Sequence, residues 1–450
     1  MTGRVAVVGG GVAGLATAFH LRDAGADAVV FERDRTPGGI LAPPLEVGDL
    51  FLEPGPDSLA ARKPWGAELC RRLGLRLVAP GASGTYLWTD TGLVPYLADT
   101  AFGIPGDVGD VLRWPGLSPR GRVRALADLV KPKRRGGVEE TLGDLLRRRL
   151  GDEATDLAIA PLLAGLHAGD VDRLSAAATF PELLAWEETQ GSLIRGAQAA
   201  QRSARRAEPG PLFLRPSGGM RELIGALAET LGDRVRTGAE VTRVGEHDVE
   251  FSDGSESVDA VVLACGADAA SALLGAVAPR GLSGIRSVST GIVLLVYPTG
   301  TADALPDATG LVVPRGEAPM TAATFLSRKW PDERFADRAV VRCYVGGAGG
   351  EDVLDAPDED IVDACARHLS AVLDLPEPAT SRVHRWWRAM PQYDLGHLDR
   401  VRRIRDELPP SIFVVGSPFD GVGVSDLARA AEETAALVLG KAGAPWKEPA

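Results

Sequence analysis

Hydrophobic and polar positions near the amino terminus follow two patterns in succession. Residues 4–8 form a short apolar run of strand length, and apolar side chains then recur at helical spacing over residues 15–24. A second apolar run, Ala28–Phe31, closes on Glu32. A strand, a tight glycine turn, a helix and a strand within about 30 residues predict a βαβ unit with parallel strands.

The rest of the chain divides into helical and strand-rich stretches. Over about residues 101–207, leucines recur at helical intervals with almost no β-branched runs, which predicts a group of helices. A helix is also predicted over about residues 425–439. Strand patterns occupy the segments Val241–Val244, Val249–Phe251, Ala260–Ala264, Thr290–Tyr297, Ala339–Val345 and Ile412–Val415.

The first turn carries the residue pattern of a dinucleotide site. The spacing G-x-G-x-x-G is formed by Gly9, Gly10, Gly11, Val12, Ala13 and Gly14. These glycines permit a tight turn, close approach of backbone to a pyrophosphate, and close packing of helix on strand. The pyrophosphate would lie at the amino end of the helix, where free N–H groups favour an anion. Glu32 follows at the distance expected for a carboxylate that binds an adenosine ribose, and it disfavours NADP.

The residues after this acid resemble a flavin-binding pattern. Arg33 is followed by the pair Gly38–Gly39, and this extension resembles the fingerprint of the FAD-binding family that includes amine oxidases, phytoene desaturases and porphyrinogen oxidases. The resemblance implies that the glycine pair brings backbone close to the flavin side of FAD. The family usually has Arg or Lys next, whereas Ile40 and Leu41 stand here. One expected phosphate contact is therefore missing or supplied elsewhere.

Further pieces of the FAD pattern follow in the family's order. The resemblance implies that the loop at 55–58 lies beside the ribityl chain and flavin, that one strand residue holds the adenine through its backbone, and that a tryptophan lies against the flavin. It also implies that the glycine-rich turn before the last helix points amides at the flavin and stabilises its anionic reduced form. The residues concerned are Gly55, Pro56, Asp57, Ser58, Val241, Trp386, Gly416, Gly421, Val422, Gly423 and Val424.

A more specific resemblance, to bacterial porphyrinogen oxidases of the coproporphyrinogen III type, covers nearly the whole chain. It implies that FAD takes hydride equivalents from a porphyrinogen in successive two-electron steps and that O2 reoxidises the flavin, with H2O2 as by-product, in haem biosynthesis. No catalytic side chain is assigned, since we find no nucleophile motif, paired carboxylates or metal-spaced histidines. The segments that carry the resemblance are Gly55–Lys63, Pro161–Ser175, Leu214–Met220, Ser327–Trp330 and Arg385–His397.

These patterns predict an α/β fold, α+β overall, made of three units. They are a discontinuous Rossmann-like FAD-binding domain, an inserted mixed-sheet substrate domain and a helical domain. The predicted boundaries are 1–65, 210–282 and 385–450 for the first, 66–100 and 283–384 for the second, and 101–209 for the third.

Substrate anchors are expected to be basic, because coproporphyrinogen III carries four propionates. The candidates in matching segments are Arg62, Lys63, Arg328 and Lys329. The basic runs 131–135 and 147–149 are instead predicted to be solvated surface. His167 and His397 are expected to be hydrogen-bonded structural residues.

Three alternatives stay open. The substrate could be protoporphyrinogen IX, or the chain could be a flavin amine oxidase or a non-catalytic FAD-binding protein. The amine oxidase is disfavoured, because the loop Gly416–Phe419 has no cysteine for a flavin link and only one aromatic residue. Porphyrin formation with O2 consumption would distinguish an enzyme from a binding protein.

Composition bounds the partners. The formal net charge of −12 argues against nucleic acid. The longest apolar runs are too short to span a bilayer, so no integral span is expected, while peripheral membrane contact stays open. The four scattered cysteines form no metal-spaced cluster, and no metal is expected; a reducing, cytoplasmic location fits them. No residue pattern sets an oligomeric state.

Overall fold

A five-stranded parallel sheet joins segments from the start, middle and end of the chain. Its order is β12-β2-β1-β16-β22, and Val5 of β1 lies opposite both Ala28 of β2 and Ala260 of β16. The predicted βαβ unit and the discontinuous Rossmann-like sheet are confirmed. The strands are β1 (Arg4–Val8), β2 (Asp27–Glu32), β12 (Val235–Thr237), β16 (Ala260–Leu263) and β22 (Ile412–Val414).

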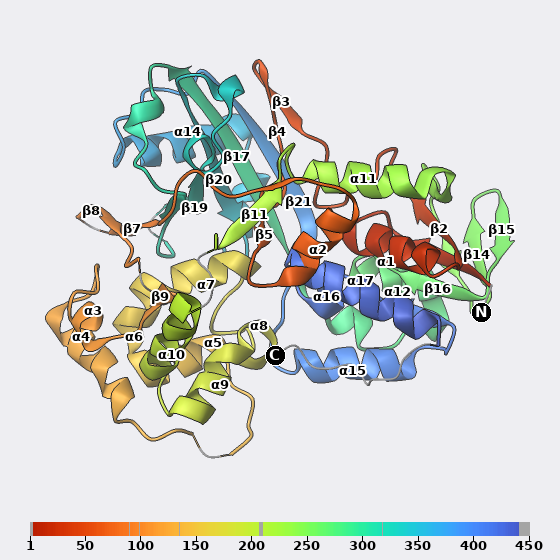
Figure 1. Ribbon diagram of the computed structural model, residues 1–450, viewed down its shortest axis with the longest axis horizontal. Helices are drawn as coiled ribbons and strands as arrows, with labels where there is room; N and C mark the ends of the chain where they lie inside the picture. The colour runs from red at the N-terminus through yellow and green to blue at the C-terminus, as the bar shows by residue number, and fades with distance from the viewer. Residues whose placement is uncertain are drawn as a thin grey trace.

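Both faces of this sheet are buried, because β1 alternates between two apolar clusters. Val5 and Val7 point to one face, and Ala6 and Val8 point to the other. The first face is covered by helices that lie close together in Figure 1, and the second by helices and a small antiparallel sheet. These helices are α1 (Val12–Asp23), α11 (Arg221–Leu231) and α17 (Val424–Val438) on the first face, and α12 (Ala267–Leu274) and α15 (His397–Glu407) on the second.

A seven-stranded mixed sheet forms the second unit, in the order β21-β17-β20-β19-β18-β7-β8. One face packs on α14 (Asp358–Ser370) through an apolar cluster. The opposite face carries Arg342 and Tyr344 and turns toward the loop at 53–57. The strands are β7 (Tyr86–Thr89), β8 (Gly92–Pro95), β17 (Ser287–Thr299), β18 (Gly310–Val312), β19 (Met320–Phe325), β20 (Arg338–Gly346) and β21 (Thr380–Pro391).

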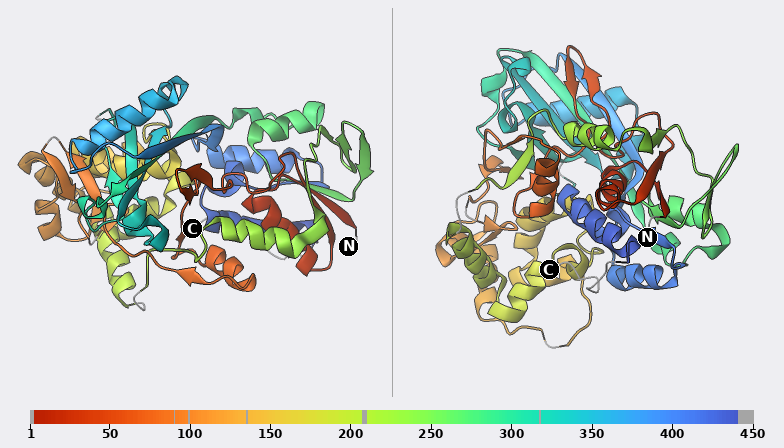
Figure 2. Two further views of the ribbon diagram at one scale, coloured as in Figure 1. Left: turned by 90° about the horizontal axis from the view of Figure 1, so that it is seen from above. Right: turned by 45° about the vertical axis from the view of Figure 1, so that its right-hand side comes forward.

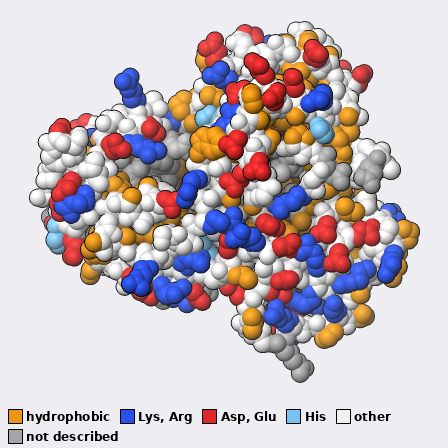
Figure 3. Space-filling view, turned by 180° about the vertical axis from the view of Figure 1, so that it is seen from behind, with side chains coloured by type: hydrophobic (Ala, Val, Ile, Leu, Met, Phe, Trp, Pro, Cys, Tyr) orange, Lys and Arg blue, Asp and Glu red, His pale blue; other side chains and the backbone are white. Residues whose placement is uncertain are grey.

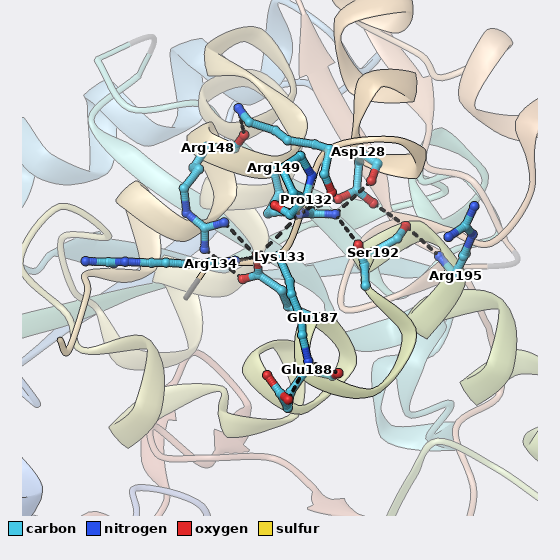
Figure 4. A network of polar contacts seen from close by, with 12 residues as sticks. Asp128, Pro132, Lys133, Arg134, Arg148, Arg149, Glu187, Glu188, Ser192 and Arg195 are labelled. Carbon is cyan, nitrogen blue, oxygen red and sulfur yellow. Dashed lines mark hydrogen bonds and ion pairs between the residues drawn. The ribbon is translucent and has the colours of Figure 1, made fainter. Parts of the chain in front are cut away.

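The third unit is helical, as predicted, and it contains a buried ionic network (Figure 4). Arg149 has a fully buried side chain that donates to the Asp128 carboxylate and to the Gly191 carbonyl at 2.6 Å. The prediction that the run 147–149 is solvated surface is therefore wrong for Arg149. Its side chain is buried because it pairs with Asp128, a partner that the spacing of residues in the sequence does not reveal. The helices are α3 (Val108–Leu112), α4 (Pro119–Leu126), α5 (Leu142–Leu150), α6 (Asp152–Ala154), α7 (Ala160–His167), α8 (Ala176–Thr179), α9 (Pro181–Gln190) and α10 (Leu193–Arg206).

Three segments pack differently from the predicted domain boundaries. Helix α2 (Pro64–Arg72) packs Leu69 and Cys70 into the parallel-sheet core, although the predicted boundary assigned its residues from 66 onward to the substrate domain. The hairpin of β3 (Leu45–Val47) and β4 (Leu50–Leu52) packs on the mixed sheet, and β21 is the edge strand of that sheet. The predicted boundaries therefore do not coincide with the ends of these elements.

The computed structural model describes residues 3–89, 91–98, 100–134, 136–206, 210–316 and 318–440. Seen from above in Figure 2, the parallel-sheet unit extends to one side, while the mixed sheet and the helical unit overlap on the other. Acidic and basic side chains are interspersed on the face shown in Figure 3. Among the described residues, no helix has the length and apolar character needed to cross a bilayer.

Candidate active site

The carboxyl ends of the parallel strands gather the predicted cofactor residues at one edge of the sheet. The turn after β1 is held by a hydrogen bond from Gly9 N to Phe31 O of 2.9 Å, and the turn after β16 by one from Ala264 N to Val8 O of 2.8 Å. Val415, after β22, donates to Leu263 O at 3.0 Å. In open α/β sheets this edge is where ligands bind.

The glycine turn leaves room and donors for an anion. Gly9 has φ +114°, and a Cβ on Gly14 would stand 2.0 Å from the Gly9 carbonyl oxygen, so neither position accepts a side chain. A Cβ built on Gly11 would have no atom of a non-neighbouring residue within 4 Å, so the space beside Gly11 is open. Helix α1 starts there without a capping side chain and without an acid in its first turn. Its free amides therefore fit a pyrophosphate.

Glu32 fixes this turn while keeping acceptor capacity. Its carboxylate accepts from Gly10 N at 2.7 Å and from Asp34 N at 2.9 Å. A carboxylate has about four acceptor positions, so ribose hydroxyls still fit. Buried Val241 lies on a segment whose Ala239 N donates to Glu32 O at 2.9 Å, which places this segment beside Glu32. The Arg33 side chain is 71% exposed and lies 3.9 Å from the Asp34 carboxylate.

The second glycine pair lies directly against the first turn. Gly38 N donates to Gly10 O at 2.8 Å, and a Cβ on Gly39 would be 3.4 Å from Gly11 Cα. A cation reaches this loop from α11: Arg221 Nη1 donates to Pro37 O at 2.5 Å and to Leu41 O at 2.7 Å. Sequence reasoning missed Arg221. Its only signal was a position directly after the matching segment that ends at Met220.

The loop at 55–58 is anchored by buried charges from the mixed sheet. Arg342 donates to Gly55 O at 2.9 Å, and Lys329 Nζ lies 2.8 Å from Asp57 Oδ1, which also accepts from Ser58. Burial disfavours the Asp57 carboxylate, but the charges of Lys329 and Arg342 outweigh it and lower the pKa to about 2. Pro56 is exposed between these anchored residues. The loop is therefore rigidly placed.

The carboxyl-terminal turn meets the first helix. Gly416 has φ +124°, and a Cβ there would lie 3.9 Å from Ala13 Cβ at the start of α1. Gly416 N donates to Asp420 Oδ2 at 2.9 Å, and Arg405 pairs with the other oxygen of Asp420. The turn continues through Gly421 (φ +114°) and positions 422–423 into α17, which starts at Val424. This turn therefore lies beside the start of α1, the helix whose amino end is bordered by the glycine turn that Glu32 binds.

Trp386 lies on the sheet face that carries the anchoring arginine. It pairs with Thr290 across β21 and β17 and is half-buried, with its ring centroid 4.4 Å from that of His384. This face contacts the loop at 55–58 through Arg342. The position is compatible with the implied flavin contact.

The four basic candidates differ in what they bind. Lys63 Nζ lies 2.7 Å from both Asp426 oxygens, and Arg62 is 57% exposed, 3.7 Å from Glu182. Arg328 donates to the carbonyls of 302 and 305, while Lys329 is buried against Asp57. All four have partners within the protein, but Arg62 and Lys63 are adjacent in sequence, directly before α2, and Arg62 is the most exposed of the four.

Two buried histidines flank Tyr393 close to the carboxyl-terminal turn. Burial lowers the pKa of His167 to about 4 and that of His397 to about 3, so both rings are neutral at pH 7. His397 stacks on Tyr393 at a centroid distance of 4.1 Å. Their Nδ1 atoms have no hydrogen-bond partner among the described residues, so the predicted hydrogen bonding is not seen at these atoms. No cluster of potential metal ligands occurs within the described ranges.

Comparison with known proteins identifies relatives that match nearly end to end. Residues 12–439 match the family model described as flavin containing amine oxidoreductase. The chain is 31% identical to coproporphyrinogen III oxidase of Bacillus subtilis (strain 168), over 94% of this chain and 95% of the relative. It is 32% identical to coproporphyrinogen III oxidase of Mycobacterium tuberculosis (strain ATCC 25618 / H37Rv), over 96% of each chain.

A solved structure is similar over nearly the whole chain. A crystal structure from Exiguobacterium sp. 255-15, assigned as a protoporphyrinogen oxidase, superposes with a TM-score of 0.85 at 29% identity, over 97% of this chain and 98% of the other. The chain therefore belongs to the flavin-containing amine oxidoreductases, within the porphyrinogen oxidase group, and is an FAD-dependent oxidoreductase.

Proposed function

We propose that this protein oxidises coproporphyrinogen III to coproporphyrin III in haem biosynthesis, with O2 as electron acceptor and H2O2 as by-product. The observation that carries the proposal is the end-to-end similarity to coproporphyrinogen III oxidases of two distant bacteria at 31% and 32% identity. We place the reaction in the cytoplasm, which is supported by the four free cysteines.

The chain's own residues bind and orient the cofactor in this proposal. FAD, when bound, supplies the hydride acceptor and its reoxidation by O2. The amino end of α1 binds the pyrophosphate, and Glu32 the ribose. The loop at 55–58 and the turn at 416–424 orient the flavin end, and Trp386 packs beside it. The protein then accelerates the reaction by holding the porphyrinogen macrocycle next to the flavin, because reactants that are already oriented avoid much of the entropic part of the barrier.

The residues directly before α2 are the proposed binding site for the propionate carboxylates of the substrate. Arg62 and Lys63 are adjacent and at least one-third exposed, so a propionate can reach them and compete with Glu182 and Asp426. Arg328 and Lys329 are weaker candidates, since their side chains are less exposed than those of Arg62 and Lys63.

A direct comparison of two porphyrinogens tests the proposal. The purified protein is given coproporphyrinogen III or protoporphyrinogen IX in air, and porphyrin fluorescence, O2 uptake and peroxide are followed against a protein-free control. We expect faster turnover of coproporphyrinogen III. Yellow protein with an oxidised-flavin spectrum that accelerates neither reaction would refute the enzyme and support an FAD-binding protein.

Protoporphyrinogen IX oxidase is the second candidate, favoured by the similarity to the Exiguobacterium structure. Faster turnover of protoporphyrinogen IX would establish it in place of the first. Primary amines assayed for peroxide release test the amine oxidase alternative in the same preparation.

A further inference from the structure

The Gly38–Gly39 loop is held by a cation that no sequence motif places there. Arg221 is the first residue of α11, and its backbone N donates to Glu53 Oε1 at 2.6 Å, so Glu53 is used by the backbone at the start of this helix. The Arg221 side chain extends away to the loop and binds the carbonyls of Pro37 and Leu41. The charge is thus delivered to a segment, Pro37–Leu41, that has no basic residue of its own.

This cation lies next to the open end of α1. A Cβ on Gly38 would stand 2.1 Å from Arg221 Nη1, so only glycine fits beneath the guanidinium. Gly38 forms a parallel bridge with Gly11, the residue that precedes α1. The guanidinium, the glycine pair and the free amides of α1 therefore border the same space.

We propose that Arg221 supplies the positive charge for the FAD pyrophosphate at this loop, in the place that Ile40 leaves uncharged. The inference rests on the FAD site described above. Both Pro37 and Leu41 contacts use Nη1, and within the described residues no acceptor is seen for Nε or Nη2, which remain as donors for phosphate oxygens. A guanidinium keeps its charge when partly buried and matches phosphate in a forked geometry.

A purely structural role is the competing explanation. Arg221 could hold the loop carbonyls and never interact with a phosphate. In that case a substitution that removes the positive charge and one that removes only the guanidinium shape would have the same effect. Each would weaken the binding of every ligand of the site to the same extent, whether or not the ligand contains phosphate. A charge role instead acts on phosphate-containing ligands and weakens with added salt.

The test uses apo protein and calorimetric titration with FAD, ADP and adenosine at low and high salt. Arg221→Gln is expected to weaken FAD and ADP by on the order of tenfold, as lost charge-assisted hydrogen bonds do, with adenosine unchanged. Arg221→Lys should retain part of the affinity, because it keeps the charge and loses the forked geometry, and Ile40→Lys added to Arg221→Gln should restore part of it. Arg4→Gln, at the opposite end of β1 and paired with Glu256 at 2.7 Å, is the matched control.

Three outcomes decide the matter. Equal losses for ADP and adenosine, or equal losses in Arg221→Gln and Arg221→Lys without salt dependence, overturn the charge role. Failure of Ile40→Lys to recover any affinity also counts against it. Wild-type protein that binds no FAD would refute the cofactor site itself, and because no porphyrinogen is used, the substrate assignment does not affect the result.

Discussion

The ion pair between Lys329 and Asp57 provides the most stringent test of how the loop at 55–58 is anchored. The Lys329 ammonium lies 2.8 Å from Asp57 Oδ1, and the side chains are only 11% and 8% exposed. We predict that Lys329→Met destabilises the protein strongly, because it leaves a carboxylate in a buried position with Ser58 and the more distant Arg342, 3.8 Å away. The expected result is loss of stability and of FAD retention together, rather than a raised KM alone.

The magnitude follows from the pKa of Asp57. Burial opposes the charge, yet Lys329 and Arg342 bring the pKa from 3.8 to about 2. That fall corresponds to roughly 2.5 kcal/mol in favour of the charged carboxylate, at about 1.4 kcal/mol per pH unit. Removal of one partner of a buried pair costs about 3–5 kcal/mol. We therefore expect a loss of about 3 kcal/mol.

Urea unfolding of the apo protein, followed by tryptophan fluorescence and circular dichroism, measures this loss as a lower midpoint at unchanged slope. Asp57→Asn in the Lys329→Met background should recover at least half of it, since no buried carboxylate is then left without its ammonium partner, and Arg342 keeps its hydrogen bonds to Gly55 O and Glu53 O. Lys133→Met removes a surface pair with Glu188 and should change little. A Lys329→Met protein as stable as Lys133→Met, or a double variant no better than the single, would refute the reasoning.

Other predictions use the same preparation. Glu32→Ala should raise the FAD dissociation constant by about tenfold, measured by titration, as loss of charge-assisted bonds does. Tyr393→Phe removes a hydroxyl that donates to Ser417 O and should alter the visible flavin spectrum, whereas Tyr96→Phe, a control in the helical unit, should not. Arg149→Met should cost about 3–5 kcal/mol in urea unfolding by leaving the buried Asp128 unpaired. Asp57 has a folded pKa below its unfolded value of 3.8, so its contribution should be complete above that pH and be lost as pH falls toward 2, measured as a midpoint decline in acid titration.

The local part of the fold could be predicted because its signals are short-range. The glycine spacing at 9–14 and the acid at Glu32 define a turn, a helix start and a strand end within one unit. The helices and strands followed from periodicity, with ends displaced by a few residues, as for the first helix, which begins at Val12. Such features depend on neighbours in sequence, which a pattern records.

The partners of buried charges could not be predicted, because topology decides them. Lys329 and Asp57 are separated by 272 positions, and Arg221 and Pro37 by 184. In the sequence Lys329 is simply a basic residue in a matching segment, and Arg149 is one of three consecutive arginines. Only burial against a particular carboxylate separates a structural cation from a solvated or substrate-binding one.

A site built largely from glycine turns has few side chains of its own to fix those turns. Three of the turns are held by a polar group from elsewhere in the chain: Glu32 binds Gly10 N, Arg221 binds the loop around Gly38, and Arg342 binds Gly55 O. It follows that the groups that hold the turns, and not an acid–base pair, carry the sensitivity of this enzyme to substitution. Their loss should therefore reduce FAD occupancy and stability without introducing a new ionisation into the pH–rate profile.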